Sequence, residues 1–396
     1  MDKKPEKLVP EVRFKGFTDD WEQHKPKDYL RESRILGHSG RNSLKLTVKL
    51  WGKGIVAKKT IGNGSQNTKY YKRMPGQLMY GKLDFLHAAF GIVPSYLRGF
   101  ESTTDSPAFD IVSGDPSFLL NEFLRKRFYE RYGLMANGSR KAKRVHEKDF
   151  LNMAFYSGSD EEQYKIGAII ETINSLITLQ QRKLEQLKLL EKALQQKLFP
   201  NSFQEKPLLR ILHGDNSWWN SYIGEVFTER VDKGSSEKLL SVSITDGVYP
   251  FDESKRKNNS SDDKHNYKKV FQNDIAYNSM RLWQGALGVS KYEGIVSPAY
   301  TVLKPLPNQN SIFYEFMFKN IDMLHIFQRN SQGLTSDTWN LKFNQLQHIK
   351  IKTTNLNSQN KIAKLLIKIE ELKNNESNYY HNLMTLKKYL LQKLFI

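Results

Sequence analysis

One stretch in the second half of the sequence carries the residue types of a metal-dependent nuclease, namely carboxylates and a nearby lysine. Asp246 precedes the run Glu253-Ser254-Lys255, and two-metal nucleases use such side chains to hold Mg²⁺ and polarise a water molecule. The run lies in a hydrophilic segment, without a strand pattern that would fix the carboxylates. The sequence therefore does not favour a catalytic role for these residues.

Other motifs of catalysis or cofactor binding are also incomplete. His146-Glu147 lacks the second histidine of a zinc-protease helix. The pairs of glycines at 52–54 and 62–64 fit neither the Walker A spacing nor the GxGxxG fingerprint, so they are better interpreted as turns. The chain has no cysteine, which excludes disulfides and thiolate metal sites. We therefore expect a binding protein with no catalytic residue, metal or cofactor of its own.

The charge of the chain indicates its class of partner. Lys plus Arg number 61 against 42 Asp plus Glu, giving a formal net charge of +19, and such a field attracts polyanions. Double-stranded DNA is the expected partner; the alternative is a basic protein whose charge only keeps it soluble. No apolar run is long enough to span a membrane, and the cytoplasm is the expected location.

Basic residues, several interleaved with aromatics, form the candidate DNA-binding set. Lysine and arginine neutralise phosphates, and neighbouring aromatics can pack on sugars. For any single lysine the alternative is a solvated surface charge, so the hypothesis depends on clusters at equivalent places in two halves of the chain. The set is Lys58, Lys59, Lys69, Tyr71, Lys72, Arg73, Arg140, Lys141, Lys143, Arg144, Lys255, Arg256, Lys257, Lys264, Lys268, Lys269 and Arg329.

These clusters belong to a duplicated unit. Lys165-Ile166 aligns with Lys361-Ile362, and the same offset (361 minus 165, or 196 residues) brings Gln196-Lys197-Leu198-Phe199 onto Gln392-Lys393-Leu394-Phe395. Each copy is long enough to hold a domain, so this is not a solenoid repeat. Two similar globular regions, each followed by a similar helix, are therefore expected in series.

Each copy ends in a long amphipathic helix. Apolar residues recur every three or four positions over 162–199 and over 361–394. A stripe of this length must be covered, and the matching stripe of the other copy can cover it in an antiparallel coiled coil with a pseudo-two-fold axis. The expected seam positions are Ile166, Ile173, Gln180, Leu187, Leu194, Ile362, Ile369, Glu376, Leu383 and Leu390.

The centre of this seam is polar in both copies. An antiparallel arrangement would bring Gln180 opposite Glu376 and fix the register. The alternative is that 373–378, which is rich in Asn and Lys, is a solvated or frayed stretch.

The regions before the helices combine strand and helix patterns. Short β-rich runs at 241–244 and 299–303 and helical segments at 118–132 and 312–327 predict an α+β fold, with a long exposed loop at 252–269. We expect a first globular domain at 1–160, a central helix at 161–200, a second domain at 201–356 and a C-terminal helix at 357–396.

The chain resembles the specificity subunit of Type I restriction-modification systems over essentially its full length. The residues that carry the resemblance are the entry segment at 10–23 (PEVRFKGFTDDWEQ) and the two helical repeats that close on Gln-Lys-Leu-Phe. The resemblance implies two mixed α/β target recognition domains, each reading one half of a bipartite, asymmetric DNA target. It also implies that the helices act as a spacer and dock two modification subunits.

The resemblance places the chemistry in partner subunits. The modification subunits would carry S-adenosylmethionine and methylate adenine at N6, and restriction subunits would use ATP and Mg²⁺ for translocation and cleavage. The candidate DNA contacts come from composition alone and are not transferred from the family. A stand-alone DNA-binding regulator or architectural protein with the same duplicated frame is the alternative function.

Overall fold

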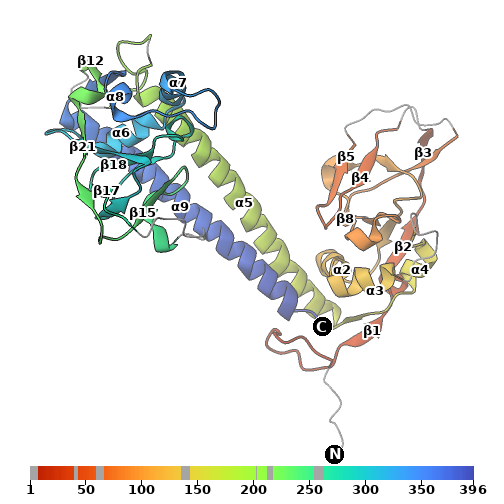
Figure 1. Cartoon of the computed structure of the whole chain (residues 1–396). Coiled ribbons are helices and arrows are strands. Elements are labelled where there is room, and N and C mark those ends of the chain that lie inside the picture. Colours follow the sequence, from red (N-terminus) through yellow and green to blue (C-terminus); the bar gives the residue numbers. More distant parts are fainter. Residues whose placement is uncertain are drawn as a thin grey trace, which may run out of the picture. The chain divides into compact units, whose positions relative to one another are not determined.

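The protein consists of two compact units joined by two long helices (Figure 1). In a computed structural model, residues 8–39, 43–58, 67–134, 143–201, 203–211, 217–253 and 263–396 are described. Unit 1 comprises residues 1–181 and 379–396, and unit 2 comprises residues 182–378. No helix in these described ranges has the length and hydropathy needed to cross a membrane.

The long helices are α5 (Asp160–Leu198) and α9 (Leu356–Lys393). Three carboxylates in the first turn of α5 complement the positive end of its dipole, and Pro200 follows its end, where a helix cannot continue. Since the boundary between the units crosses both helices, each unit contains a part of α5 and a part of α9.

In its described residues, unit 1 builds four antiparallel sheets, with strand orders β2-β10-β7-β8, β3-β6-β9, β4-β5 and β1-β11. Four short helices and two 3₁₀ turns accompany them there. The elements are β1 (Glu22–His24), α1 (Pro26–Tyr29), β2 (Leu30–Ser33), β3 (Leu36–Ser39), β4 (Leu46–Val48), β5 (Ile55–Ala57), β6 (Lys69–Lys72), β7 (Leu78–Tyr80), η1 (Phe85–His87), β8 (Phe90–Ile92), η2 (Ser95–Leu97), β9 (Glu101–Ser102), β10 (Ala108–Ile111), α2 (Pro116–Phe123), α3 (Lys126–Gly133), α4 (Glu147–Leu151) and β11 (Phe155–Ser157).

Unit 2 builds the same set of sheets, with strand orders β13-β21-β18-β19, β14-β17-β20, β15-β16 and β12-β22. The elements are β12 (Trp218–Tyr222), η3 (Ile223–Glu225), β13 (Phe227–Glu229), β14 (Lys233–Gly234), β15 (Leu240–Ser243), β16 (Gly247–Pro250), η4 (Phe251–Glu253), β17 (Tyr267–Val270), β18 (Ile275–Asn278), η5 (Leu282–Gln284), β19 (Leu287–Val289), β20 (Gly294–Val296), β21 (Tyr300–Pro305), α6 (Ser311–Phe318), α7 (Ile321–Asn330), α8 (Phe343–Leu346) and β22 (Lys350–Thr354). The matching sheets confirm the internal repeat and the α+β fold class predicted from the sequence.

The antiparallel pairing of the long helices is visible inside each unit. In unit 2, Lys373 of α9 binds Glu191 of α5 at 2.7 Å, and Lys183 binds Glu376. In unit 1, Leu390 and Leu391 of α9 pack against the core that contains Ile166 and Ile170 of α5. Residue numbers increase along α5 while those of the contacting residues in α9 decrease, so the two helices run in opposite directions. The predicted antiparallel coiled coil is confirmed.

The ten predicted seam positions are all buried or half-buried. The stretch 373–378 lies within α9 and is therefore not frayed, but Asn374, Asn375, Ser377 and Asn378 are exposed, as the solvated alternative predicts. Gln180 is 5% exposed, but it belongs to unit 1 and Glu376 belongs to unit 2. Their pairing across the middle of the seam stays a prediction.

The repeated Gln-Lys-Leu-Phe ends pack their Leu and Phe side chains into the cores of the two units. Phe395 stacks on Phe118 of α2 with ring centroids 5.1 Å apart in unit 1. Phe199 lies 5.3 Å from Phe313 of α6 in unit 2. The end of each long helix is therefore held by aromatic contacts with one short helix, α2 in unit 1 and α6 in unit 2.

A buried glutamine anchors the beginning of each long helix. The Gln163 amide donates to Gly158 O at 3.1 Å and to the hydroxyls of Tyr29 and Ser157 at 3.4 Å. In unit 2 the Gln359 amide donates to Thr354 O at 2.7 Å and to the hydroxyls of Tyr314 and Thr353. Both glutamines are 1% exposed, so each helix is fixed to its domain by the same polar network.

Two sequence predictions need correction. Each predicted helical segment, 118–132 and 312–327, is divided into two helices, because Arg125 and Asn320 adopt extended backbone angles at the N-caps of α3 and α7. The predicted loop at 252–269 includes the first part of β17, whose Tyr267 is buried and pairs with Gly234. The polar composition of this segment hid the strand.

Candidate nucleic-acid interface

The basic and aromatic runs of the two copies lie on corresponding strands. The run 69–72 forms β6, which is the centre of the sheet β3-β6-β9, and 267–270 forms β17, the centre of β14-β17-β20. In unit 1 the Lys45 ammonium lies 5.3 Å from the Tyr70 ring centroid. A twisted strand lined with cations and rings can contact both phosphate and sugar.

Arg73 does not belong to the exposed set predicted from the sequence. Its guanidinium donates to Ser102 Oγ at 2.7 Å, to Ser33 O at 3.0 Å and to Ser106 O at 3.2 Å, and the residue is 2% exposed. Burial lowers the pKa of Arg73 to about 10. Arg73 thus joins neighbouring strands inside the domain, and we remove it from the candidate contacts.

Several predicted contacts are already paired with acids. Lys268 binds Glu229 and Lys269 binds Glu237, both at 2.9 Å, and the bond from Lys269 lowers the pKa of Glu237 to about 2. Arg144 lies 3.4 Å from Asp105. A phosphate would have to compete with a carboxylate at these positions, which reduces the electrostatic gain from each contact.

The remaining described candidates form the set of accessible cations. Lys58, Lys69, Lys143 and Arg329 are exposed, and Lys72 and Lys264 are half-buried. Tyr71 is half-buried, and the Arg73 guanidinium carbon lies 5.7 Å from the centroid of the Tyr71 ring. Within the described part of the chain none of these six cations has an acidic partner within ion-pair distance. Lys59, Arg140, Lys141, Lys255, Arg256 and Lys257 lie outside the described residues.

The residues with nuclease-like chemistry have structural roles where they are described. Asp246 accepts hydrogen bonds from Ser243 Oγ and Thr245 Oγ1, both at 2.8 Å, in the turn between β15 and β16. Glu253 ends the 3₁₀ helix η4, while Ser254 and Lys255 fall outside the described ranges. No group of three potential metal ligands occurs among the described residues.

The entry segment at 10–23 contains Arg13 and Trp21, whose partner the sequence did not predict. The Glu162 carboxylate accepts from Arg13 Nε at 2.6 Å, from Arg13 Nη2 at 2.8 Å and from Trp21 Nε1 at 3.0 Å. This cluster ties the entry segment to the first turn of α5. The spacing of 8 residues between the Arg and Trp in both copies (21 minus 13, and 218 minus 210) was the available signal.

The architecture of this chain is similar to that of a known protein structure, although no sequence family matches. No family model and no curated protein matches the chain. A crystal structure of the Type I restriction-modification S subunit from M. genitalium is 13% identical, with a TM-score of 0.59 over 98% of this chain and 99% of that one.

Two further solved structures are less similar, with TM-scores below 0.5. They are the HsdS subunit from Thermoanaerobacter tengcongensis (14% identity, 95% and 96% coverage, TM-score 0.46) and a chain from a study of type I R-M complex assembly (14%, 99% and 99%, 0.48). From the first likeness, the chain has the fold of a Type I restriction-modification S subunit.

Proposed function

We propose that this chain is the DNA-specificity subunit of a Type I restriction-modification complex. The observation that carries the proposal is the full-length likeness to an S subunit, including both units and both long helices. The formal charge of +19 and the accessible cations of both units, with Lys69 and Lys72 on β6, support DNA as the ligand.

The target is proposed to be bipartite and asymmetric. Each unit offers a basic central strand, β6 or β17, but the two strands differ in sequence and in how their cations are paired. Two unlike readers on one chain select two unlike half-sites. The long helices serve as the spacer that sets the distance between those half-sites.

The chemistry is proposed to reside in partner subunits in the cytoplasm. Two modification subunits supply S-adenosylmethionine-dependent methylation of adenine at N6, and restriction subunits supply ATP- and Mg²⁺-dependent cleavage. This chain contributes only the choice of DNA sequence, which agrees with the structural roles of Asp246 and of its neighbours Ser243 and Thr245.

The direct test is to express this chain together with candidate modification subunits and to map methylated adenines in the host genome. We expect one split, asymmetric motif that disappears when this chain is deleted. A purified assembly should contain one copy of this chain for two modification subunits. Failure to form any assembly, together with sequence-specific DNA binding by the isolated chain, would favour the stand-alone regulator instead.

A further inference from the structure

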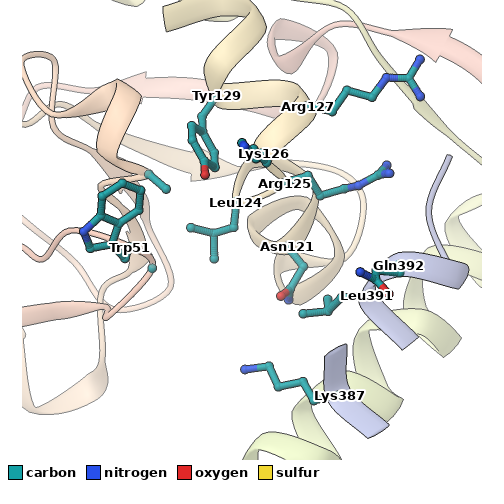
Figure 2. Close-up of a pocket in the computed structure, with 12 residues that line it drawn as sticks. Trp51, Asn121, Leu124, Arg125, Lys126, Arg127, Tyr129, Lys387, Leu391 and Gln392 are labelled. Carbon is teal, nitrogen blue, oxygen red and sulfur yellow. The ribbon is translucent and has the colours of Figure 1, made fainter. Parts of the chain in front are cut away.

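A cavity in unit 1 lies where α2 and α3 meet the last turns of α9. Its volume is about 570 Å³, within the range of small-molecule sites. Figure 2 shows the indole of Trp51 on one side and Lys387 of α9 on the other, with Leu124 and Asn121 between them. All of these residues belong to unit 1.

The charged residues that line the cavity are all cations: Arg125, Lys126, Arg127 and Lys387. Glu122 and Glu130 do not line it; Glu122 binds Arg125 at 3.2 Å, and Glu130 lies 3.6 Å from Lys126. Lys387 has no acid within ion-pair distance among the described residues, although burial lowers its pKa. An anion that binds a half-buried ammonium without a counter-ion forms a strong charge-assisted hydrogen bond, because the charge is otherwise unpaired.

Trp51 adds an aromatic surface to this positive cavity. The residue is 56% exposed and adopts a φ of +60°, a conformation that bulky side chains rarely tolerate. Backbone hydrogen bonds from Trp51 and Gly52 to His87 O and Ala88 O, at 2.7 and 2.9 Å, hold this turn in place. Strain of this kind is retained mainly where a side chain must be presented in one direction.

Unit 2 provides an internal comparison. Lys387 corresponds to Glu191 at the offset of the repeat, 387 minus 196, and Glu191 is paired with Lys373. At the junction of α6 and α7, Asn320 and Asp322 stand where α2 and α3 have Arg125 and Arg127. The shared frame therefore does not require the cations, and their concentration is specific to unit 1.

We propose that the cavity of unit 1 binds a nucleotide. Lys387 holds the phosphate, and the indole of Trp51 stacks on the base. The shared chemistry, a phosphate beside a planar base, is available both from a free nucleotide and from a nucleotide within a DNA strand. The proposal does not depend on the role in sequence recognition, because it concerns a single nucleotide and one unit.

The test is a set of titrations of the full-length chain by calorimetry, using AMP, adenosine, inorganic phosphate and a single-stranded oligonucleotide of about eight nucleotides. Lys387→Gln should weaken AMP or oligonucleotide binding about tenfold, since it removes one charge-assisted contact. Trp51→Leu should weaken it about tenfold through lost stacking, and Trp51→Phe should restore most of the affinity.

Matched controls separate the cavity from general charge and aromaticity. Lys388→Gln removes an exposed cation from the same helix, and Trp219→Leu removes an exposed tryptophan from unit 2; both should bind as wild type. Loss of AMP binding in the cavity variants identifies a free nucleotide as the ligand. Loss of oligonucleotide binding alone identifies a DNA strand.

Three results would overturn the nucleotide site. The first is that the wild-type chain binds neither AMP nor the oligonucleotide. The second is that the cavity variants and the control variants bind with equal affinity. The third is that inorganic phosphate binds as tightly as AMP and that Trp51→Leu leaves this affinity unchanged. Genome methylation is measured separately, so failure here leaves the specificity function intact, and a normal nucleotide site with no methylation motif would reject that function alone.

Discussion

Arg73 illustrates how neighbouring residues of one basic run acquire different roles. Lys72 and Arg73 are adjacent in sequence, but Arg73 turns inward to three oxygen acceptors while Lys72 remains partly accessible. Composition predicted both as phosphate contacts because it contains no information on which side of the strand end each side chain lies. Burial decides between a DNA contact and a structural residue.

We expect Arg73→Met to lower the free energy of unfolding by about 1–3 kcal/mol, because the Ser33 carbonyl and the buried Ser102 hydroxyl lose the donor that Arg73 supplies. Lys72→Glu should instead weaken DNA binding and make its salt dependence shallower, with little loss of stability. Urea unfolding and binding measured over a salt series check the two variants. Equal stability of Arg73→Met and wild type would contradict the structural role.

Glu122 gives unit 1 a pH-dependent stability. Burial, partly opposed by Arg125, raises the pKa of Glu122 from 4.5 to about 7. The folded state therefore binds more protons than the unfolded state between these values, and stability falls as pH rises through that window. The loss is at most about 3 kcal/mol above the folded pKa. Glu122→Gln should flatten this fall in urea unfolding series; an unchanged pH profile would show that another group causes it.

At the scale of elements, the long helices were predictable and the breaks in the short ones were not. The three- and four-residue periodicity of α5 and α9 extends over many turns, so a few residues that depart from the pattern do not change the helix prediction. The division at Arg125 depends on one extended residue in a run whose propensities are helical. The central strand β17 was missed because its Lys-rich sequence is stabilised by pairing with β14 and β20, which the sequence does not show.

The two glutamine anchors give a matched pair of tests. Gln163→Leu removes the donor shared by Tyr29, Ser157 and Gly158, and should destabilise the fold by about 1–3 kcal/mol. Gln359→Leu should have a similar cost in unit 2. Thermal unfolding of both variants, with the exposed Gln181→Leu as control, measures the effect. Identical melting of all three variants would mean that the networks contribute no stability.

At the scale of the whole molecule, the duplicated frame was predictable because the offset of 196 residues persists from helix to helix. The candidate interface was only partly predictable. Clusters on β6 and β17 emerged from composition, whereas the pairing of Lys268 and Lys269 with Glu229 and Glu237 depends on strands distant in sequence. The cavity beside Lys387 was also missed, since it unites the loop at Trp51 with the last turns of α9.

Under the proposed function, removal of one heptad from 162–199 should change the distance between the two half-sites or abolish the assembly. A heptad preserves the stripe of apolar residues while shortening the helix by about 10 Å. Methylation mapping in cells that carry the shortened chain reads the spacing directly. Methylated sites identical to wild type would rule out a spacer role for α5.

The placement of Leu394 and Phe395 in the core of unit 1 has a consequence during translation. A ribosome completes residues 1–181 long before it makes the segment 379–396 that closes the same core. The first domain must therefore keep an apolar face exposed until this late segment is made. In the folded chain Phe395 covers that face and is itself only 3% exposed. Nascent chains stalled before residue 379 should bind chaperones through this face, whereas unit 2, continuous in sequence, can fold as it emerges.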